Sequence, residues 1–328
     1  MAGTTVDFKT TINPHSVASE ISDRWTEWNN ARQTKIDEWK ELRNYVYATD
    51  TRTTANSKLP WTNSTTTPKL TQIADNLHAN YFSALFPQKR WFRFEASDSD
   101  SDTKAKRDTI QAYLENKIRQ SDFENTTSKL INDYIQYGNC FASVDFVKDY
   151  TTYEDGERAV NYLGPKLVRI SPFDICFNPL APDFGSSPKI IRSIMTKGEV
   201  KRKIDETVDN AYMEEIFEKM LFNRSAASGT DVDVSKSQAF IADGFSSLQE
   251  YYESDFVEIL TFYGDMYDAD HNHYHKNRII TVVDRSYVLS NEQNPSWLGK
   301  ASVFHAGWRD RPDNLYSMGP LDNLVGMQ

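Results

Sequence analysis

The sequence lacks the features that define secreted and membrane-spanning proteins. Only two cysteines occur among 328 residues, Cys140 and Cys176, and each lies in an apolar stretch. We interpret them as small buried side chains of a protein in a reducing compartment. No run of about 18 apolar residues occurs, as a membrane-spanning helix requires. The polar start, Met1 to Pro14, has no apolar core of a signal peptide. We therefore expect a cytosolic location at synthesis and no membrane partner.

An excess of basic residues is also missing. Lys and Arg number 37 against 47 Asp and Glu, which gives a net charge of -10. Proteins that coat nucleic acid neutralise phosphates with clustered Lys and Arg, so this chain is a poor general nucleic-acid binder. The charge does not exclude a protein that lets DNA pass without holding it.

Familiar catalytic motifs are absent as well. No Gly-x-Ser-x-Gly elbow, His-Glu-x-x-His or Cys-x-x-Cys pattern occurs. The triplet Gly299-Lys300-Ala301 has part of a phosphate-binding loop, but that loop needs a glycine five residues before Gly299, where Asn294 stands. It also needs Ser or Thr where Ala301 stands. We therefore expect no ATP hydrolysis, no catalytic residues and no cofactor.

One cluster does contain metal-ligating side chains. His271, His273 and His275 alternate with other residues just after Asp268 and Asp270. On a strand the three histidines would share one face, where they could ligate zinc or a similar ion. The cluster falls between two predicted strands, however, so a solvated hairpin loop is the favoured interpretation. A structural metal and a catalytic metal stay open as weaker alternatives.

Aromatic residues are abundant, at 13% of the chain, and the periodicity of apolar residues changes along the sequence. Helical periodicity dominates the first part, and alternation typical of strands dominates the rest. The sequence therefore predicts an α+β fold, with long N-terminal helices followed by antiparallel β-sheets and inserted helices. The expected regions are a flexible arm (1–16), a helical part (17–138), a β-sheet region (139–195), a helical insertion with a mobile loop (196–255), a β meander (256–310) and the start of a helix (311–328).

Several helices and strands can be placed within these regions. We expect helices over Ser16–Ala48, Lys69–Leu85, Asp102–Gln120, Phe123–Tyr137, Lys197–Thr207 and Tyr212–Phe222. Gly138 is a natural helix stop, and Thr196 is a natural helix cap. Strands are expected over 90–95, 140–146, 157–162, 166–170, 189–195, 256–266, 279–283 and 286–289. Asp155-Gly156 predicts a hairpin turn.

The order of these features resembles the portal proteins of tailed bacteriophages, particularly short-tailed ones. In the C-terminal third, the strand Phe256–Gly264 precedes an Asn294-Pro295 turn and then the step from Tyr316 to Gly319. In the N-terminal half, a Trp-rich helix and a Trp-Thr-Asn loop precede a helix that ends in Leu-Phe-Pro. Helix pairs then lead to Tyr137-Gly138 and a strand. The resemblance spans most of the chain, which would correspond to the outer wing-like part.

The resemblance implies a structural subunit of a ring, usually dodecameric, at one capsid vertex. Such a ring forms the channel for genome packaging and ejection. Its partners would be further copies of itself, the major capsid protein, the terminase large subunit, a head-tail adaptor or tail proteins, and double-stranded DNA in the channel. The protein would reside in the virion at the portal vertex, and in the host cytoplasm during assembly. A separate terminase ATPase would explain why this chain has no Walker A loop.

The resemblance also assigns a role to the closing segment. Gly319 and Pro320 would open the stem helix that lines the channel, and Leu321, Leu324 and Val325 have the spacing of one face of that helix. Because family portals are much longer, we expect the polypeptide to continue beyond Gln328, and an intact virion protein near 37.8 kDa would contradict this.

Two other functions stay open from the sequence. One is a head-tail adaptor or minor capsid protein, which would share the structural character of a portal. The other is a metal-dependent hydrolase built on His271, His273 and His275.

Overall fold

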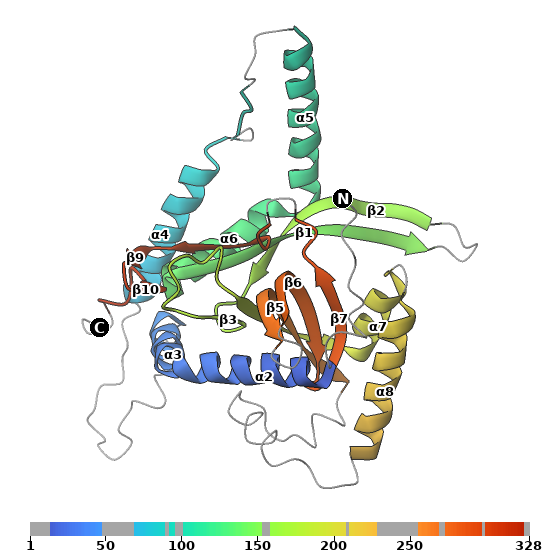
Figure 1. Ribbon diagram of the computed structural model, residues 1–328. Helices are drawn as coiled ribbons and strands as arrows, with labels where there is room; N and C mark the ends of the chain where they lie inside the picture. The colour runs from blue at the N-terminus through green and yellow to red at the C-terminus, as the bar shows by residue number, and fades with distance from the viewer. Residues whose placement is uncertain are drawn as a thin grey trace, which may run out of the picture. The chain divides into compact units, whose positions relative to one another are not determined.

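The computed structural model describes residues 14–47, 69–88, 92–95, 101–152, 158–207, 210–227, 255–268, 273–296 and 299–324. It confirms the α+β class, with N-terminal helices followed by antiparallel sheets (Figure 1). The chain forms two compact units, each assembled from three stretches of sequence. Unit 1 contains Met1–Gln33, Phe173–Asn178 and Gly185–Ala301, and unit 2 contains Thr34–Pro172, Pro179–Phe184 and Ser302–Gln328.

Unit 1 is built on a five-stranded antiparallel sheet. Its strands are β3 (Ile175–Phe177), β4 (Lys189–Thr196), β5 (Phe256–Asp268), β6 (His273–Val283) and β7 (Tyr287–Gln293), and they lie side by side in that order. The last three form the predicted meander, whose strands prove longer than expected. The sheet also includes β3, where no strand was predicted.

Helices cover both faces of this sheet. On one face, α2 (Pro14–Ala31) buries Ala18, Ile21 and Trp25 against strand residues that include Leu260 and Phe262. On the other face, α7 (Lys197–Asp205) and α8 (Ala211–Ala227) pack against the residues that alternate with these, such as Val257 and Ile259. Alternating strand residues point to opposite faces, so the same strands contribute buried side chains to a helix–sheet core on each face.

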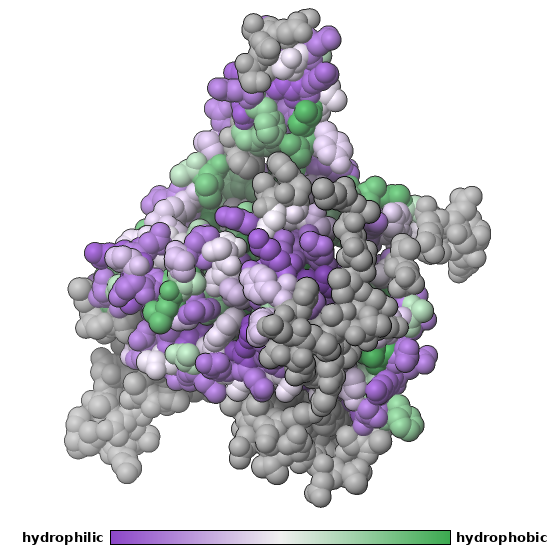
Figure 2. Space-filling model, viewed as in Figure 1, coloured by the Kyte–Doolittle hydropathy of each residue, from purple (hydrophilic) through white to green (hydrophobic). Residues whose placement is uncertain are grey.

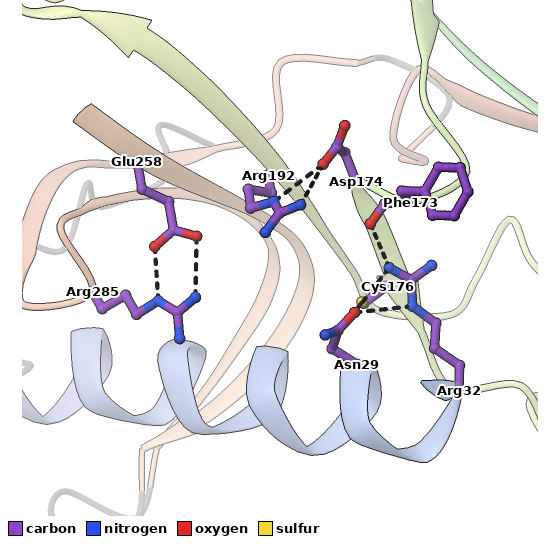
Figure 3. A network of polar contacts seen from close by, with 8 residues as sticks. All are labelled: Asn29, Arg32, Phe173, Asp174, Cys176, Arg192, Glu258 and Arg285. Carbon is purple, nitrogen blue, oxygen red and sulfur yellow. Dashed lines mark hydrogen bonds and ion pairs between the residues drawn. The ribbon is translucent and has the colours of Figure 1, made fainter. Parts of the chain in front are cut away.

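The helix predicted over Ser16–Ala48 is in fact two helices, α2 and α3 (Gln33–Tyr47), interrupted at Arg32. The Arg32 guanidinium donates hydrogen bonds to the Phe173 carbonyl oxygen at 2.6 Å and to Asn29 Oδ1 at 3.2 Å (Figure 3). Because Phe173 is 141 residues away in the sequence, the residues around Arg32 do not predict this interruption.

Buried ion pairs hold the turns of unit 1. Arg285 forms two hydrogen bonds with Glu258, at 2.7 and 3.1 Å, and the two side chains are 9% and 1% exposed (Figure 3). Arg224 of α8 binds Asp284 at 2.6 Å, with 3% and 4% exposed. Paired geometry of this kind compensates the cost of removing each charge from water.

Unit 2 combines helices with a smaller sheet. Its helices are α3, α4 (Lys69–Leu85), α5 (Ser101–Gln120) and α6 (Phe123–Tyr137), as predicted to within one residue for the last three. Their core contains Leu42, Val46, Leu70, Ala74, Ile131 and Ile135. The three-stranded antiparallel sheet has the order β2 (Arg158–Ile170), β1 (Asn139–Thr152) and β8 (Val303–Gly307). A separate pair joins β9 (Arg309–Arg311) to β10 (Asn314–Met318).

Local signals set the transition from helices to sheet. Gly138 ends α6 with φ 67°, as the sequence predicted for a helix stop. Thr196 caps α7 through a reciprocal pair of hydrogen bonds with Glu199, which confirms the predicted cap. The antiparallel pairing of β1 with β2 confirms the predicted hairpin, although its Asp155-Gly156 turn lies outside the described residues. The strands expected over 157–162 and 166–170 are one continuous strand.

Other expectations need correction or stay untested. Residues 92–95 are not a strand, although one was predicted over 90–95. Between 311 and 318 the chain forms β10 and the end of β9 instead of a helix. Helix α8 runs to Ala227, beyond the predicted helix end at Phe222. Most of the region in which a mobile loop was expected lies outside the described residues, as do most of the N-terminal arm and residues 48–68. No helix among the described residues is long and apolar enough to cross a membrane.

Candidate assembly surface and C-terminal junction

The predicted stem-helix junction forms a tight turn. The Gly319 N–H donates a hydrogen bond to the Asp322 carboxylate at 2.9 Å, and the Leu324 N–H donates to the Leu321 carbonyl at 2.9 Å. Pro320 stands at the position after Gly319, where a helix tolerates a missing N–H. The bond from the Gly319 N–H to a carboxylate three residues on is of the kind made at a helix N-terminus, and residues 322–324 form a hydrogen-bonded turn and not a helix. Val325 lies outside the described residues.

The junction is anchored in the helical core of unit 2. Leu321 is fully buried within the cluster formed by α3, α4 and α6, and Leu324 packs against that cluster. Asp322 also lies 3.5 Å from Lys35 Nζ. The structure thus brings together four of the five predicted junction residues, and it directs Leu321 into the core of the same chain.

A buried asparagine, Asn139, ties the junction to the sheet. Its Oδ1 accepts hydrogen bonds from the Ser317 N–H at 2.9 Å and from His305 Nε2 at 3.0 Å. Its Nδ2 donates to the carbonyl oxygens of Tyr137 at 2.8 Å and Ser317 at 3.0 Å. All four bonding positions of this fully buried amide are therefore used, which joins β1, β8 and β10 at one point.

Burial also determines the charge state of this network. It lowers the pKa of His305 to about 4, against an opposing effect of Asp310. The imidazole is therefore neutral at physiological pH, as expected of a ring that stacks on Phe141 with centroids 4.7 Å apart.

The backbone of Gly138 lies in close contact with that of Gly319 at the junction. A Cβ atom on Gly138 would lie 2.4 Å from the Gly319 backbone nitrogen, and Gly138 also has positive φ. Any other residue at position 138 would therefore clash with the junction as well as strain the end of α6.

A second candidate surface lies on the three-stranded sheet. Val144 and Phe146 alternate along β1, and Phe304 of β8 pairs with Ala142 next to them. Leu163 of β2 lies opposite Lys148, one step further on the same face. Of these four apolar side chains, Val144 is 39% exposed, Phe146 64%, Phe304 58% and Leu163 37%. We call them the open face.

Among the residues that the structure describes, α6 covers the inner end of this face. Arg169, which pairs with Ala142, binds Asp133 of α6 through two bonds of 2.5 and 2.7 Å. Burial raises the pKa of Asp133, and the hydrogen bond from Arg169 opposes this rise. In the described chain, β8 pairs with β1 only from Asn139 to Ser143. From Val144 onward, β1 pairs only with β2 among the described strands, so the outer part of the β1–β2 hairpin is two-stranded.

Helix α5 also presents apolar side chains to solvent. Ile110 and Tyr113 are each 52% exposed, and no side chain described for this helix is fully buried. Its contact with the hairpin includes Lys117, whose ammonium lies 5.2 Å from the centre of the Tyr162 ring. Figure 2 shows hydrophobic residues at the surface of α5 and of the hairpin.

The predicted histidine cluster is split by the described boundaries. His275 lies on β6 opposite Met266, and His273 lies on the same strand opposite Asp268. These two positions belong to strands, whereas a loop was the favoured interpretation. Within the described ranges, no three His, Cys, Asp or Glu side chains are placed to hold a metal. His271 lies outside those ranges, so the metal site stays an untested prediction.

Comparison with known protein families gives a match. Residues 18–160 match the family model described as bacteriophage head to tail connecting protein. The match runs from α2 to the start of β2 and covers somewhat less than half of the chain. No match was found among curated proteins.

The family match supports a connector-type protein of a bacteriophage, with a structural role between head and tail. A connector is a component of the virion, and capsid and tail proteins are its general partners. The matched family is structural, which is consistent with a role other than catalysis.

Sequence reasoning missed Asn139 and the open face. Asn139 carries a weak signal, because a polar residue directly after the helix stop Gly138 begins an otherwise apolar alternation. The alternation of Val144 and Phe146 correctly indicated a strand. It did not indicate exposure, because a face covered by the same chain and a face left open have the same pattern.

Proposed function

We propose that the chain is a structural subunit of a ring-shaped phage portal at the capsid vertex. In this proposal the ring forms the channel for genome packaging and ejection, and it is the docking point for terminase and tail. The observation that carries the proposal is the open face of Val144, Phe146, Leu163 and Phe304, which the described residues leave exposed in a chain whose residues 18–160 match a phage connector family.

The energetic argument starts from the cost of exposing these side chains. Burying one large apolar side chain contributes about 1.5–3 kcal/mol. A two-stranded hairpin without further cover is marginally stable in water. The outer part of the β1–β2 hairpin bears Phe146 at 64% exposed, Val160 at 56% and Tyr150 at 42%. Contact with a neighbouring subunit would bury these groups, and Ile110 and Tyr113 of α5 are further exposed apolar side chains of the same unit.

The geometry favours contact through the face of the hairpin and not through its edge. Pro165 lies on β2, an edge strand of the sheet, and it has no N–H to donate to an added strand. Proline on an edge strand opposes edge-to-edge pairing. In our proposal, therefore, a neighbour packs onto the open face.

The junction supplies the second element of the proposal. It is supported by the bond from the Gly319 N–H to the Asp322 carboxylate, which resembles that of a helix N-terminus, and by Leu321, which is held in the core of unit 2. We propose that the turn at the junction begins the stem helix next to the channel, with Gly319 and Pro320 as its first residues and Leu324 and Val325 on its face. The net charge of -10 suits a channel that conducts DNA without retaining it.

Negative-stain microscopy of the purified chain tests the proposal. We expect closed rings with a central hole at protein concentrations that favour assembly. Classification of particles at the tail vertex of whole virions extends the test to the assembled state. A protein that stays monomeric in solution and is not found at that vertex would contradict a portal subunit.

A head-tail adaptor is the second candidate, since the family match speaks of a connection between head and tail and not of a ring. The two differ in their order of assembly. An adaptor would bind only to a preassembled portal, whereas a portal subunit would assemble with copies of itself.

A further inference from the structure

A polar pocket in unit 1 lies apart from the surfaces described above. It is formed by the connection between β3 and β4, a bulge in β5, the middle of β6 and the segment that follows β7, and its volume is about 190 Å³. Its lining includes three lysines, Lys189, Lys276 and Lys300. The volume is below the about 300–1,000 Å³ of sites for drug-sized molecules, which points to a small ion or group.

The charge balance inside the pocket is positive. Lys276 and Lys300 are exposed, and neither has an ion pair with any residue that the structure describes. Lys189 is 1% exposed and donates to the Gly185 carbonyl oxygen at 3.4 Å. The lining contains one carboxylate, Asp265, against these three ammonium groups, within a protein whose net charge is -10.

The carboxylate of Asp265 forms hydrogen bonds with two residues of β6. One of its oxygens accepts a hydrogen bond from the Asn277 N–H at 2.7 Å, and the other accepts from the Tyr274 hydroxyl. Both carboxylate oxygens therefore already accept hydrogen bonds, which reduces their ability to neutralise a lysine of the lining. The lining contains more lysines than carboxylates.

The same bonds fix Asn277 in place. Its backbone has φ 52°, its carbonyl accepts from the Asn294 N–H at 2.9 Å, and its Oδ1 accepts from Asn294 Nδ2 at 3.1 Å. With Oδ1 thus engaged, Nδ2 of Asn277 is a donor for which the described chain provides no acceptor. The lining therefore includes an amide held in place by these bonds, together with two lysines that form no ion pair within the described chain.

From this geometry we propose that the pocket binds a tetrahedral oxyanion of the phosphate class. Lysine ammonium groups bind phosphate as point charges, and an amide N–H adds a directed hydrogen bond. Lys300 belongs to the Gly299-Lys300-Ala301 triplet, which lacks the rest of a Walker A loop, so the site binds without hydrolysing ATP. The oxyanion is either a free phosphate or a phosphate of a DNA backbone.

The first experiment titrates inorganic phosphate and pyrophosphate into the full chain at low ionic strength, followed by calorimetry. We expect saturable binding that weakens as salt is added, because the charges that hold the ion are exposed. Removal of one charged hydrogen-bond donor should weaken binding about tenfold or more. This loss is expected for Lys276→Ala and for Lys300→Ala. Lys219→Ala, at an exposed position of α8 outside the pocket, is the matched control.

The second experiment distinguishes the two sources of the ion. Binding of a double-stranded oligonucleotide is measured by fluorescence anisotropy, with pyrophosphate as competitor. If the natural ligand is a DNA phosphate, both lysine variants lose affinity, the salt slope falls by about 1 for each lysine, and pyrophosphate competes. If only the free anions bind, the site serves free phosphate.

Both of these outcomes support an oxyanion site. The proposal is overturned if the wild-type chain shows no saturable binding of phosphate or pyrophosphate at low salt. It is also overturned if Lys276→Ala and Lys300→Ala bind these anions as tightly as the wild type and the Lys219→Ala control. The experiment needs no assembled ring, so its outcome is separate from that of the proposed function.

Discussion

The two sheets of this protein are covered to very different degrees. In unit 1, α2 covers one face of the five-stranded sheet and α7 and α8 cover the other, so that residues such as Leu260 and Phe262 are fully buried. Among the described residues of unit 2, α6 covers the inner end of one face of the three-stranded sheet, and Phe146 and Phe304 stay more than half exposed. The described chain therefore buries the apolar side chains of the first sheet and leaves apolar side chains exposed on the second. We infer that the second surface is reserved for another subunit.

The first prediction concerns the covered sheet, where the largest loss of stability is expected. Phe262→Ala removes a fully buried ring from between α2 and the sheet and should cost about 3–5 kcal/mol of unfolding free energy. Urea denaturation followed by tryptophan fluorescence measures this. Phe222→Ala, at a position 72% exposed on α8, is the control and should stay within about 0.5 kcal/mol of wild type. Equal losses in the two variants would contradict the burial described for unit 1.

The second prediction concerns the junction of unit 2. Asn139→Ala removes four hydrogen bonds, but the space left by the amide can admit water to the groups that lose a partner, so the net loss should be about 1–3 kcal/mol, the cost of one unsatisfied buried polar group. We expect a loss of stability somewhat below that of Phe262→Ala, measured in the same way. Asn125→Ala, at an exposed position whose side chain bonds only Asp122 in the described chain, should change little. A stable Asn139→Ala variant would show that the network does not anchor β10.

The third prediction is a pH dependence in the same network. The pKa of His305 is about 4 in the folded protein, and about 6.5 is usual in an unfolded chain. Between these values the unfolded chain binds the proton and the folded chain does not, so stability should fall as the pH drops from about 6.5 towards about 4. His305→Gln should flatten this part of the stability curve. If the variant keeps the wild-type slope in denaturation at pH 7, 6, 5 and 4, another group causes it.

Much of the fold could be predicted, because its signals are local. The bounds of α4 and α6, the stop at Gly138 and the cap at Thr196 each depend on a few neighbouring residues. The interruption at Arg32 could not be predicted, because its partner Phe173 comes from a distant part of the chain. The strand β10 was missed for a similar reason, since Ser317 is held by Asn139 across 178 residues.

The candidate site also has a part that could be predicted from the sequence and a part that could not. Gly319, Pro320, Leu321 and Leu324 were singled out from the sequence, and the structure places them in one turn, although their role in a channel stays a prediction. The open face could not be recognised, because exposure depends on which faces the helices of the same chain cover. The three lysines of the pocket come from separate segments of the sequence, and only the folded sheet brings them together.

The fourth prediction, with the smallest expected effect on stability, concerns the open face. Phe146→Ser and Phe304→Ser change side chains that are already solvated, so each should alter the unfolding free energy of the monomer by no more than about 0.5 kcal/mol. Urea denaturation at protein concentrations too low for assembly measures this. A large loss for either variant would mean that the open face belongs to the core of the folded chain itself.

Sedimentation velocity of the wild-type chain and of the Phe146→Ser/Phe304→Ser double variant tests the central claim most directly. We predict that the wild type forms a concentration-dependent larger species and that the double variant sediments as a 37.8 kDa monomer. A Phe222→Ser control in unit 1 should assemble like the wild type. A double variant that assembles as readily as the wild type, or a wild type that stays monomeric at every concentration, would contradict the claim that the open face joins subunits.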